Sequence, residues 1–296
     1  MKNNKPLVSV VMTAYNAADF VVESVHSIQA QSYHNWELII VNDGSTDRTS
    51  DLIKDLAKHD RRIHLIDLQK NVGASRASNL GLAKAKGKFI ARIDADDISI
   101  SDRLDKQIEF LLSHPDVIVV GGQCELIDRD GKSIGLKAFP TDHQKIYERL
   151  YQYNPIQHPS MMINTKLLGK QKITYHTEVL LAHDLEILFK LAQYGKMANL
   201  PDVVLKYRIH NDSLSLRHPK ATFKHTLKVR QIAKDSYGYI PSRAGIVVHN
   251  VQKIVLTILP SIVVYPLFRM IRMRKITEFR AQLAYGMAVL IGMLSR

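Results

Sequence analysis

The chain has 296 residues, of which 46% are hydrophobic, enough for one large domain or for one domain with an appendage. Its single cysteine, Cys124, excludes an internal disulfide framework and is typical of a protein in a reducing compartment. The formal net charge of +13 is concentrated in residues 217–296, which hold 14 Lys or Arg and 2 Asp or Glu, so we expect that segment to have an anionic partner of its own.

Strand-like and helix-like segments alternate through the first 120 residues. Apolar, β-prone runs predict strands at residues 7–12, 36–41, 63–66, 89–93 and 117–120. Helices are predicted between them, near residues 18–31, 46–58, 74–85 and 102–113. This alternation predicts an α/β fold with a mostly parallel sheet and helices on both of its faces. Ligands of such sheets bind beyond the carboxyl ends of the strands.

Polar and acidic side chains follow the first, second and fourth predicted strands. They are Thr13, Tyr15, Asp43, Asp94, Asp96 and Asp97. Three carboxylates within residues 94–97 repel one another, and their desolvation costs several kcal/mol each unless a cation or hydrogen-bond donors compensate. No glycine-rich phosphate loop of either common type occurs, so we expect Mg²⁺ or Mn²⁺ to hold substrate phosphates here. Taken alone, the acidic cluster is equally compatible with a polar loop that caps the next helix.

The half of this domain beyond residue 120 carries further candidate groups. Asp184 lies in the first turn of a helix predicted around residues 182–194, where the helix dipole favours an ionised carboxylate. That position suits a general base, although a merely stabilising first-turn aspartate fits it as well. Arg208 and His210 lie two residues apart further on, so the guanidinium could meet a phosphate and the imidazole a metal ion.

The C-terminal segment, residues 217–296, combines basic and apolar stretches. Its apolar run at 254–268 contains two prolines and is shorter than the roughly 20 residues that span a bilayer. A second apolar stretch at 283–294 is shorter still. This pattern favours helices that lie in the interface of an anionic membrane, with a helical hairpin packed on the protein's own core as the alternative. Nucleic acid is not expected as a partner, because the basic residues lack interleaved aromatics.

Several motifs occur in a fixed order along the chain. They are V-S-V-V-M-T-A-Y-N at 8–16, V-N-D-G-S-T-D at 41–47, N-V-G-A-S-R-A-S-N-L-G at 71–81, A-R-I-D-A-D-D at 91–97 and Y-R-I-H-N-D-S at 207–213. Together with Asp184 they resemble the family 2 inverting glycosyltransferases, which transfer sugars from nucleotide diphosphates and have the Rossmann-like GT-A fold. The resemblance implies a GT-A domain over residues 1–216, with a donor half at about 1–120 and an acceptor half at about 121–216. Residues 217–296 would form a helical, membrane-associating extension.

The resemblance also implies roles for individual residues. Thr13, Tyr15 and Asp43 would hold the nucleotide, and Asp94 would approach its ribose. Asp96 would bind the Mg²⁺ or Mn²⁺ ion that bridges the diphosphate, with His210 as a further metal contact. Asp184 would be the general base. Because negative charge grows on the leaving diphosphate, Arg208 is expected to help stabilise it. The chain departs from the family at His183, where a glutamate often precedes the base.

The expected activity is inverting, metal-dependent transfer of a sugar from a nucleotide-diphosphate donor, with a UDP-sugar as the favoured donor. The expected acceptor is a hydroxyl of a lipid-linked saccharide or a cell-surface glycan precursor. The basic segment 217–296 favours a peripheral location on the cytoplasmic face of the cell membrane. Two alternatives are transfer directly onto polyprenyl phosphate and a non-catalytic membrane protein that binds nucleotide sugars.

Overall fold

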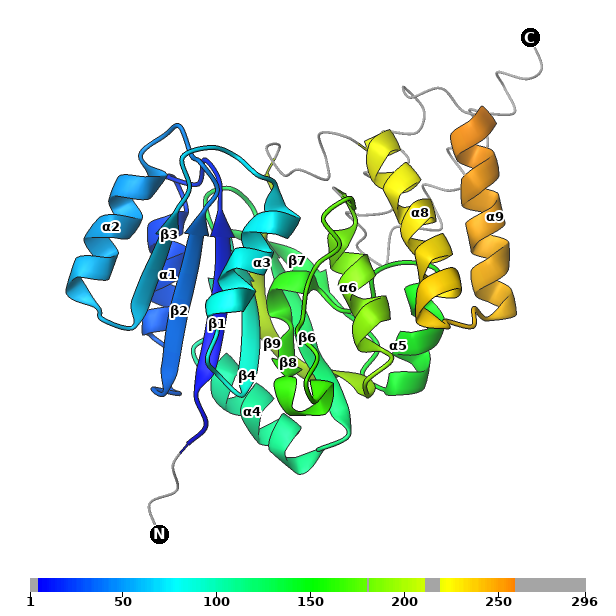
Figure 1. Ribbon diagram of the computed structural model, residues 1–296, viewed down its shortest axis with the longest axis horizontal. Coiled ribbons are helices and arrows are strands. Elements are labelled where there is room, and N and C mark those ends of the chain that lie inside the picture. Colours follow the sequence, from blue (N-terminus) through cyan, green and yellow to red (C-terminus); the bar gives the residue numbers. More distant parts are fainter. Residues whose placement is uncertain (1–4, 180, 211–218, 259–296) are drawn as a thin grey trace.

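The computed structural model describes residues 5–179, 181–210 and 219–258. Within them one nine-stranded sheet has the order β3-β2-β1-β4-β8-β6-β9-β5, with β7 paired to β6 (Figure 1). The strands are β1 (Val8–Ala14), β2 (Trp36–Asn42), β3 (Ile63–Asp67), β4 (Phe89–Asp94), β5 (Ile98–Ser99), β6 (Val117–Ile127), β7 (Ser133–Lys137), β8 (Met162–Asn164) and β9 (Lys196–Arg208). The helices are α1 (Val21–Gln29), α2 (Thr49–His59), α3 (Ala74–Lys84), α4 (Arg103–Ser113), α5 (His143–Leu150), α6 (His183–Leu191), α8 (Pro219–Tyr237) and α9 (Arg243–Ile258), with short 3₁₀ turns η1 (His158–Ser160) and η2 (Thr165–Leu168).

The first four strands of the chain form the parallel half of the sheet. β1 pairs in parallel with β2 and β4, and β2 pairs in parallel with β3. Side chains on the two faces enter two separate cores, because successive residues of a strand point to opposite sides. The core on one face includes residues of α1, α2 and α4, whereas the core on the other includes residues of α3, α5, α6 and α8. The prediction of an α/β fold with helices on both faces is confirmed.

The second half of the sheet is mixed. β8 runs antiparallel between β4 and β6, β6 and β9 are parallel, and β5 is antiparallel to β9. The strand predicted to end at residue 120 continues through Gly121 and Gly122 to Ile127. Both glycines are closely approached: a Cβ on Gly121 would lie 2.3 Å from Asn199 Oδ1, and one on Gly122 would lie 2.6 Å from a Val204 methyl group. Here glycine marks tight packing between strands, and not the strand end that its low strand propensity suggests.

The described part of the C-terminal segment packs on the domain. α8 lies against α6, and α9 lies on the far side of α8 (Figure 1). Val229 and Ala233 of α8 are fully buried in the same core as Leu185 and Leu188 of α6. None of the helices in the described ranges is both long and apolar enough to cross a membrane. The apolar stretch at 283–294 and most of that at 254–268 lie outside the described residues.

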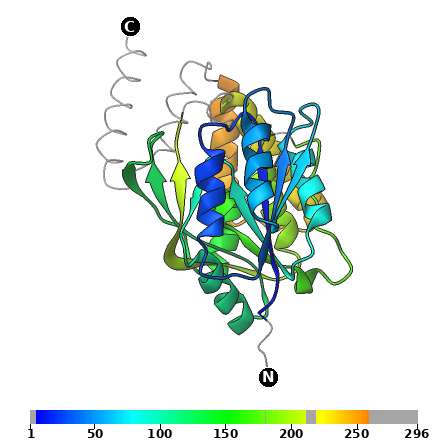
Figure 2. The same cartoon turned by 90° about the vertical axis from the view of Figure 1, so that its left-hand side faces the viewer.

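The parallel strands place their carboxyl ends at one end of the molecule. β1 enters from the N-terminal end and runs to the opposite end, and β2 and β4 run the same way beside it (Figures 1 and 2). The polar segments that follow these strands therefore meet at one edge, which is where ligands of parallel sheets bind.

Candidate active site

Strand register brings the predicted donor-side residues together. Thr13 on β1 is paired with Asp94 on β4 and with Val41 on β2, so Thr13 lies beside the acidic cluster. Tyr15 follows β1 with 51% of its surface exposed at this edge. The next residue, Asn16, has φ of 49° and accepts a hydrogen bond on Oδ1 from the Thr46 backbone N–H. The loops after β1 and β2 are thus tied to each other beside the acidic residues.

Asp43 is buried under the loop that precedes α3. Its carboxylate accepts hydrogen bonds from the backbone N–H groups of Val72 at 2.7 Å and Gly73 at 3.0 Å. Gly73 has φ of 90°, a conformation that glycine adopts without strain. Asp43 therefore holds the loop before α3 in place at this edge of the sheet. Its contact with a nucleotide stays a prediction.

The acidic cluster is a compact set of oxygen ligands. One carboxylate oxygen from each of Asp94, Asp96 and Asp97 lies within 4.8 Å of the others. Asp97 is fully buried, and its Oδ2 has no hydrogen-bond partner among the described residues. Desolvation, followed by the charge of Asp96, raises the pKa of Asp94 to about 7, and the same two causes raise the pKa of Asp97. A set of hard carboxylate oxygens with an unsatisfied buried acceptor fits Mg²⁺ or Mn²⁺.

The structure also brings His210 to this cluster. Its Nε2 lies 2.9 Å from Asp96 Oδ2, and its ring lies 5.1 Å from the ring of Phe20, centroid to centroid. The two residues predicted to contact the metal are therefore neighbours, although they are 114 positions apart in the chain.

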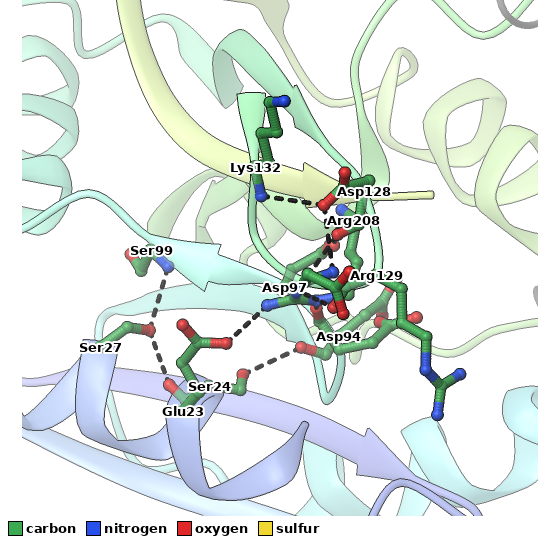
Figure 3. Close-up of polar contacts among 12 residues, drawn as sticks. Glu23, Ser24, Ser27, Asp94, Asp97, Ser99, Asp128, Arg129, Lys132 and Arg208 are labelled. Atoms are coloured by element: carbon green, nitrogen blue, oxygen red, sulfur yellow. Dashed lines mark hydrogen bonds and ion pairs between the residues drawn. The ribbon is translucent and has the colours of Figure 1, made fainter. Parts of the chain in front are cut away.

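Arg208 is placed differently from what its predicted role suggests. Only 2% of its surface is exposed, and its backbone N–H donates to Asp97 Oδ1 at 2.9 Å. Its guanidinium donates to four oxygen atoms: the carbonyls of Asp96 (2.8 Å), Asp128 (3.2 Å) and Arg129 (2.7 Å) and the carboxylate of Glu23 (2.6 Å) (Figure 3). In this arrangement Arg208 clamps the turn after β6 onto the acidic loop. A direct contact with phosphate stays a prediction.

Asp184 lies in the first turn of α6, as predicted. Asn154 Nδ2 donates to Asp184 Oδ2 at 3.0 Å. The negative charge of Asp184 adds to the rise in the pKa of Asp94 that desolvation and Asp96 cause. Immediately before the helix, Ala182 has φ of 83°, which is strained for a residue with a Cβ. The carboxylates of Asp184 and Asp94 therefore interact electrostatically, and the role of Asp184 as a base stays a prediction.

A buried polar group beneath Asp94 was not predicted from the sequence. Arg92 is 1% exposed, and its nearest guanidinium nitrogen lies 3.9 Å from Asp94 Oδ1. Its guanidinium carbon lies 5.9 Å from the ring of Tyr175, whose hydroxyl is 2.7 Å from His158 Nε2. Desolvation and the charge of Arg92 lower the pKa of His158. The sequence held one signal for this position of Arg92. Side chains alternate along a strand, so Arg92 and Asp94 must lie on the same face.

Comparison with known proteins agrees with this geometry. The sequence profile described as glycosyl transferase family 2 matches residues 9–174. A putative teichuronic acid biosynthesis glycosyltransferase, TuaG of Bacillus subtilis, is 34% identical over 79% of this chain and 91% of its own length.

Two solved structures share the fold. One is S. aureus TarS 1-349 in complex with UDP-GlcNAc, with a TM-score of 0.60, 19% identity and coverage of 75% of this chain and 65% of that chain. The other is the mannosyltransferase PcManGT from Pyrobaculum calidifontis in complex with GDP-Man and Mn²⁺, with a TM-score of 0.58, 18% identity and coverage of 98% and 81%. The fold is thus the GT-A fold, and the chain belongs to glycosyl transferase family 2.

Proposed function

We propose that this glycosyltransferase moves a sugar from a nucleotide diphosphate onto a hydroxyl of a lipid-linked saccharide or cell-surface glycan precursor, with inversion at the anomeric carbon. The observation that carries the proposal is the compact acidic cluster of Asp94, Asp96 and Asp97 at the carboxyl end of β4, with His210 Nε2 2.9 Å from Asp96 Oδ2. The nucleotide sugars bound by TarS and PcManGT support the donor class, and a UDP-sugar remains the favoured donor. The name of TuaG, a relative assigned to teichuronic acid biosynthesis, supports a glycan acceptor.

On the donor side, Thr13, Tyr15 and Asp43 line the edge where the nucleoside would lie, and Asp94 would approach the ribose. Asp96 and His210 would hold Mg²⁺ or Mn²⁺, with the buried Asp97 adding negative charge beneath them. When bound, the metal neutralises the charge that develops on the leaving diphosphate.

On the acceptor side, Asp184 would take the proton from the acceptor hydroxyl. The hydroxyl oxygen then bonds to the anomeric carbon as the bond from that carbon to the diphosphate oxygen breaks. Attack and departure on opposite faces invert the configuration, and the nucleoside diphosphate leaves. Arg208 would support the leaving group from a distance, because it holds the backbone of Asp96 in place.

Two substitutions test this assignment. Asp184→Asn should lower kcat by about 10²- to 10⁴-fold while the Kd of the nucleotide diphosphate with Mn²⁺ stays unchanged. Asp96→Asn should weaken metal-dependent nucleotide binding and transfer together. Asp130→Asn, in the exposed turn after β6, is the matched control. Full transfer by both Asp184→Asn and Asp96→Asn would overturn the mechanism, whereas metal-dependent binding without transfer by the unmodified protein would favour the non-catalytic alternative.

We also propose that the enzyme associates peripherally with the cytoplasmic face of an anionic membrane through its C-terminal segment. An apolar row on α9 supports this: Val247, Val251 and Ile254 are 61%, 52% and 56% exposed and lie at helical spacing. Lysine and arginine are frequent on the neighbouring helix α8, and Arg243 and Lys253 lie on α9, which suits negatively charged headgroups.

Co-sedimentation with lipid vesicles tests the membrane proposal. The triple substitution of Val247, Val251 and Ile254 by serine should abolish binding to vesicles that contain phosphatidylglycerol, and neutral phosphatidylcholine vesicles should bind the unmodified protein weakly. Leu112→Ser, at an exposed apolar residue on α4, is the control. A membrane role for this face would be contradicted if the triple variant bound vesicles as well as the unmodified protein. It would also be contradicted if the substitutions changed the oligomeric state and left vesicle binding unchanged.

A further inference from the structure

Hydrogen bonds at both ends of the short segment 152–154 connect the C-terminal helices to Asp184. Arg230 on α8 is 1% exposed, and one terminal nitrogen of its guanidinium donates to the Gln152 carbonyl oxygen at 2.8 Å. The other terminal nitrogen donates to Gln252 Oε1 on α9 at 2.5 Å. Two residues after Gln152, Asn154 donates to the Asp184 carboxylate at 3.0 Å. The path therefore runs from α9 through α8 and the turn after α5 to the proposed base.

The charge of Arg230 suits the position that it occupies. Gln152 and Tyr151 follow directly on the carboxyl end of α5, where the backbone carbonyls carry partial negative charge and attract a cation. The guanidinium also lies 5.5 Å from the centre of the Tyr151 ring. Burial lowers the pKa of Arg230 to about 10, because its charged form is poorly solvated there. A buried guanidinium is costly, so the hydrogen bonds of Arg230 to the Gln152 carbonyl and to Gln252 must be kept for it to stay buried.

Aromatic rings from α9 and from the segment between α8 and α9 cover the turn. The ring of Tyr151 stacks on that of Tyr239 at 5.7 Å and on that of His249 at 5.2 Å, centroid to centroid. The Tyr239 hydroxyl donates to the Tyr147 carbonyl oxygen at 2.6 Å. The α8–α9 pair therefore holds the end of α5 by packing as well as by hydrogen bonds.

A second contact reaches the helix of the base directly. Glu186, two residues after Asp184, is fully buried on α6 and accepts a hydrogen bond from the Tyr237 hydroxyl at the end of α8. Both the turn that contacts Asp184 and the helix that carries it are thus braced by the C-terminal helices.

We propose that α8 and α9 are a positioning element for the general base. Arg230, held by Gln252, fixes the turn after α5, and Asn154 in that turn sets the orientation of the Asp184 carboxylate. This inference rests on the proposed role of Asp184 as the base. Arg230 and Asn154 act through Asp184 and not on the substrate, so their loss should lower kcat and leave donor binding intact.

A double-mutant cycle in the full-length chain tests the path. Asn154→Ala should lower kcat about ten- to hundred-fold, and Arg230→Lys, which keeps the charge but loses the planar fork, about tenfold. The double variant should be no slower than Asn154→Ala alone, because both changes interrupt one path. The Kd for nucleotide diphosphate with Mn²⁺ should stay within about twofold of that of the unmodified enzyme. Lys234→Met, at an exposed lysine on the same helix, is the control.

The pH profile adds a measurement that purely structural support would not change. A carboxylate that loses a hydrogen-bond donor binds its proton more tightly, so Asn154→Ala should move the acidic limb of the kcat profile to higher pH. If Arg230→Lys does not fold, Gln252→Leu removes the contact with α9 instead and should lower kcat in the same direction.

The outcomes separate this inference from the proposed function. If the Asp184→Asn variant transferred sugar at the full rate, Asp184 would not be the base. The positioning inference would then fail together with the proposed function. An inactive Asp184→Asn enzyme beside fully active Asn154→Ala and Arg230→Lys variants would overturn the positioning inference alone. The positioning inference would also fail if the effects of the two substitutions on kcat multiplied independently, or if donor affinity fell as much as kcat.

Discussion

Replacing Arg208 by lysine distinguishes a clamp from a phosphate ligand. Lysine keeps the positive charge but cannot donate in the four directions that the guanidinium uses, so we expect two or three partly buried carbonyl oxygens to lose their donor. At about 1–2 kcal/mol for each, the free energy of unfolding should fall by about 2–6 kcal/mol. The ion pair with Glu23 adds up to about 1 kcal/mol, because the carboxylate side chain is 56% exposed and solvent screens it.

Thermal unfolding and nucleotide binding together form the assay. A loss of this size should lower Tm by roughly 10 °C in a chain of this length. Nucleotide affinity should fall as well, because Arg208 holds the backbone of Asp96. Glu23→Gln, which removes the ion pair alone, should change Tm by no more than a few degrees and is the matched control.

One result would refute the clamp interpretation. If Arg208→Lys unfolds at the temperature of the unmodified protein while nucleotide affinity falls about hundredfold, the four contacts of the guanidinium do not stabilise the fold. Arg208 would then act on the phosphate directly, as its position in the sequence motif suggests.

Three further predictions concern stability. Burial, Arg92 and His183 hold the pKa of His158 below 6.5, so neutral His158 contributes fully to the free energy of unfolding above about pH 6.5, and this contribution is lost as the pH falls. His158→Gln should therefore make Tm less sensitive to acid than in the unmodified protein. Equal sensitivity of the two Tm values to acid would contradict this. Gly121→Ala places a Cβ 2.3 Å from Asn199 Oδ1, so it should lower the free energy of unfolding by about 1–3 kcal/mol in a denaturant titration. An unchanged midpoint of that titration would argue against the close approach. Ala182→Gly should raise Tm by a few degrees, because glycine adopts φ of 83° without the roughly 1 kcal/mol cost that alanine bears. A lower Tm would show that the backbone of Ala182 is not strained.

The parallel half of the fold was predictable because it depends on local patterns. Apolar runs of strand length alternate with one-sided helical stripes, and parallel strands joined by helices must place their carboxyl ends at one edge. Thr13 and Asp94 could therefore be assigned to the same edge, and the structure pairs them directly. The mixed half was less predictable, since its antiparallel neighbours come from distant parts of the chain.

The surroundings of individual charged residues could not be predicted. In the sequence, Arg208 is a cation near a histidine. Only the fold shows that its donors bind Glu23 and the turn after β6, which are 79 or more positions away. Arg92 reads as part of an apolar strand, yet it lies buried beneath Asp94. Such contacts depend on which side chains meet across the sheet, and this information is absent from local spacing.

By itself, the sequence determined that three carboxylates would stand at the ligand edge of an α/β sheet and that Asp184 would lie in the first turn of a helix, because strand polarity and helix boundaries are local properties. The tertiary structure decided how those groups are held. Asn154 on Asp184, Arg230 on the end of α5 and the packing of α8 on α6 join segments that are tens of residues apart. The physical reason is that a buried charge is compensated by whichever partners the fold brings within hydrogen-bonding distance, and that distance is set by packing.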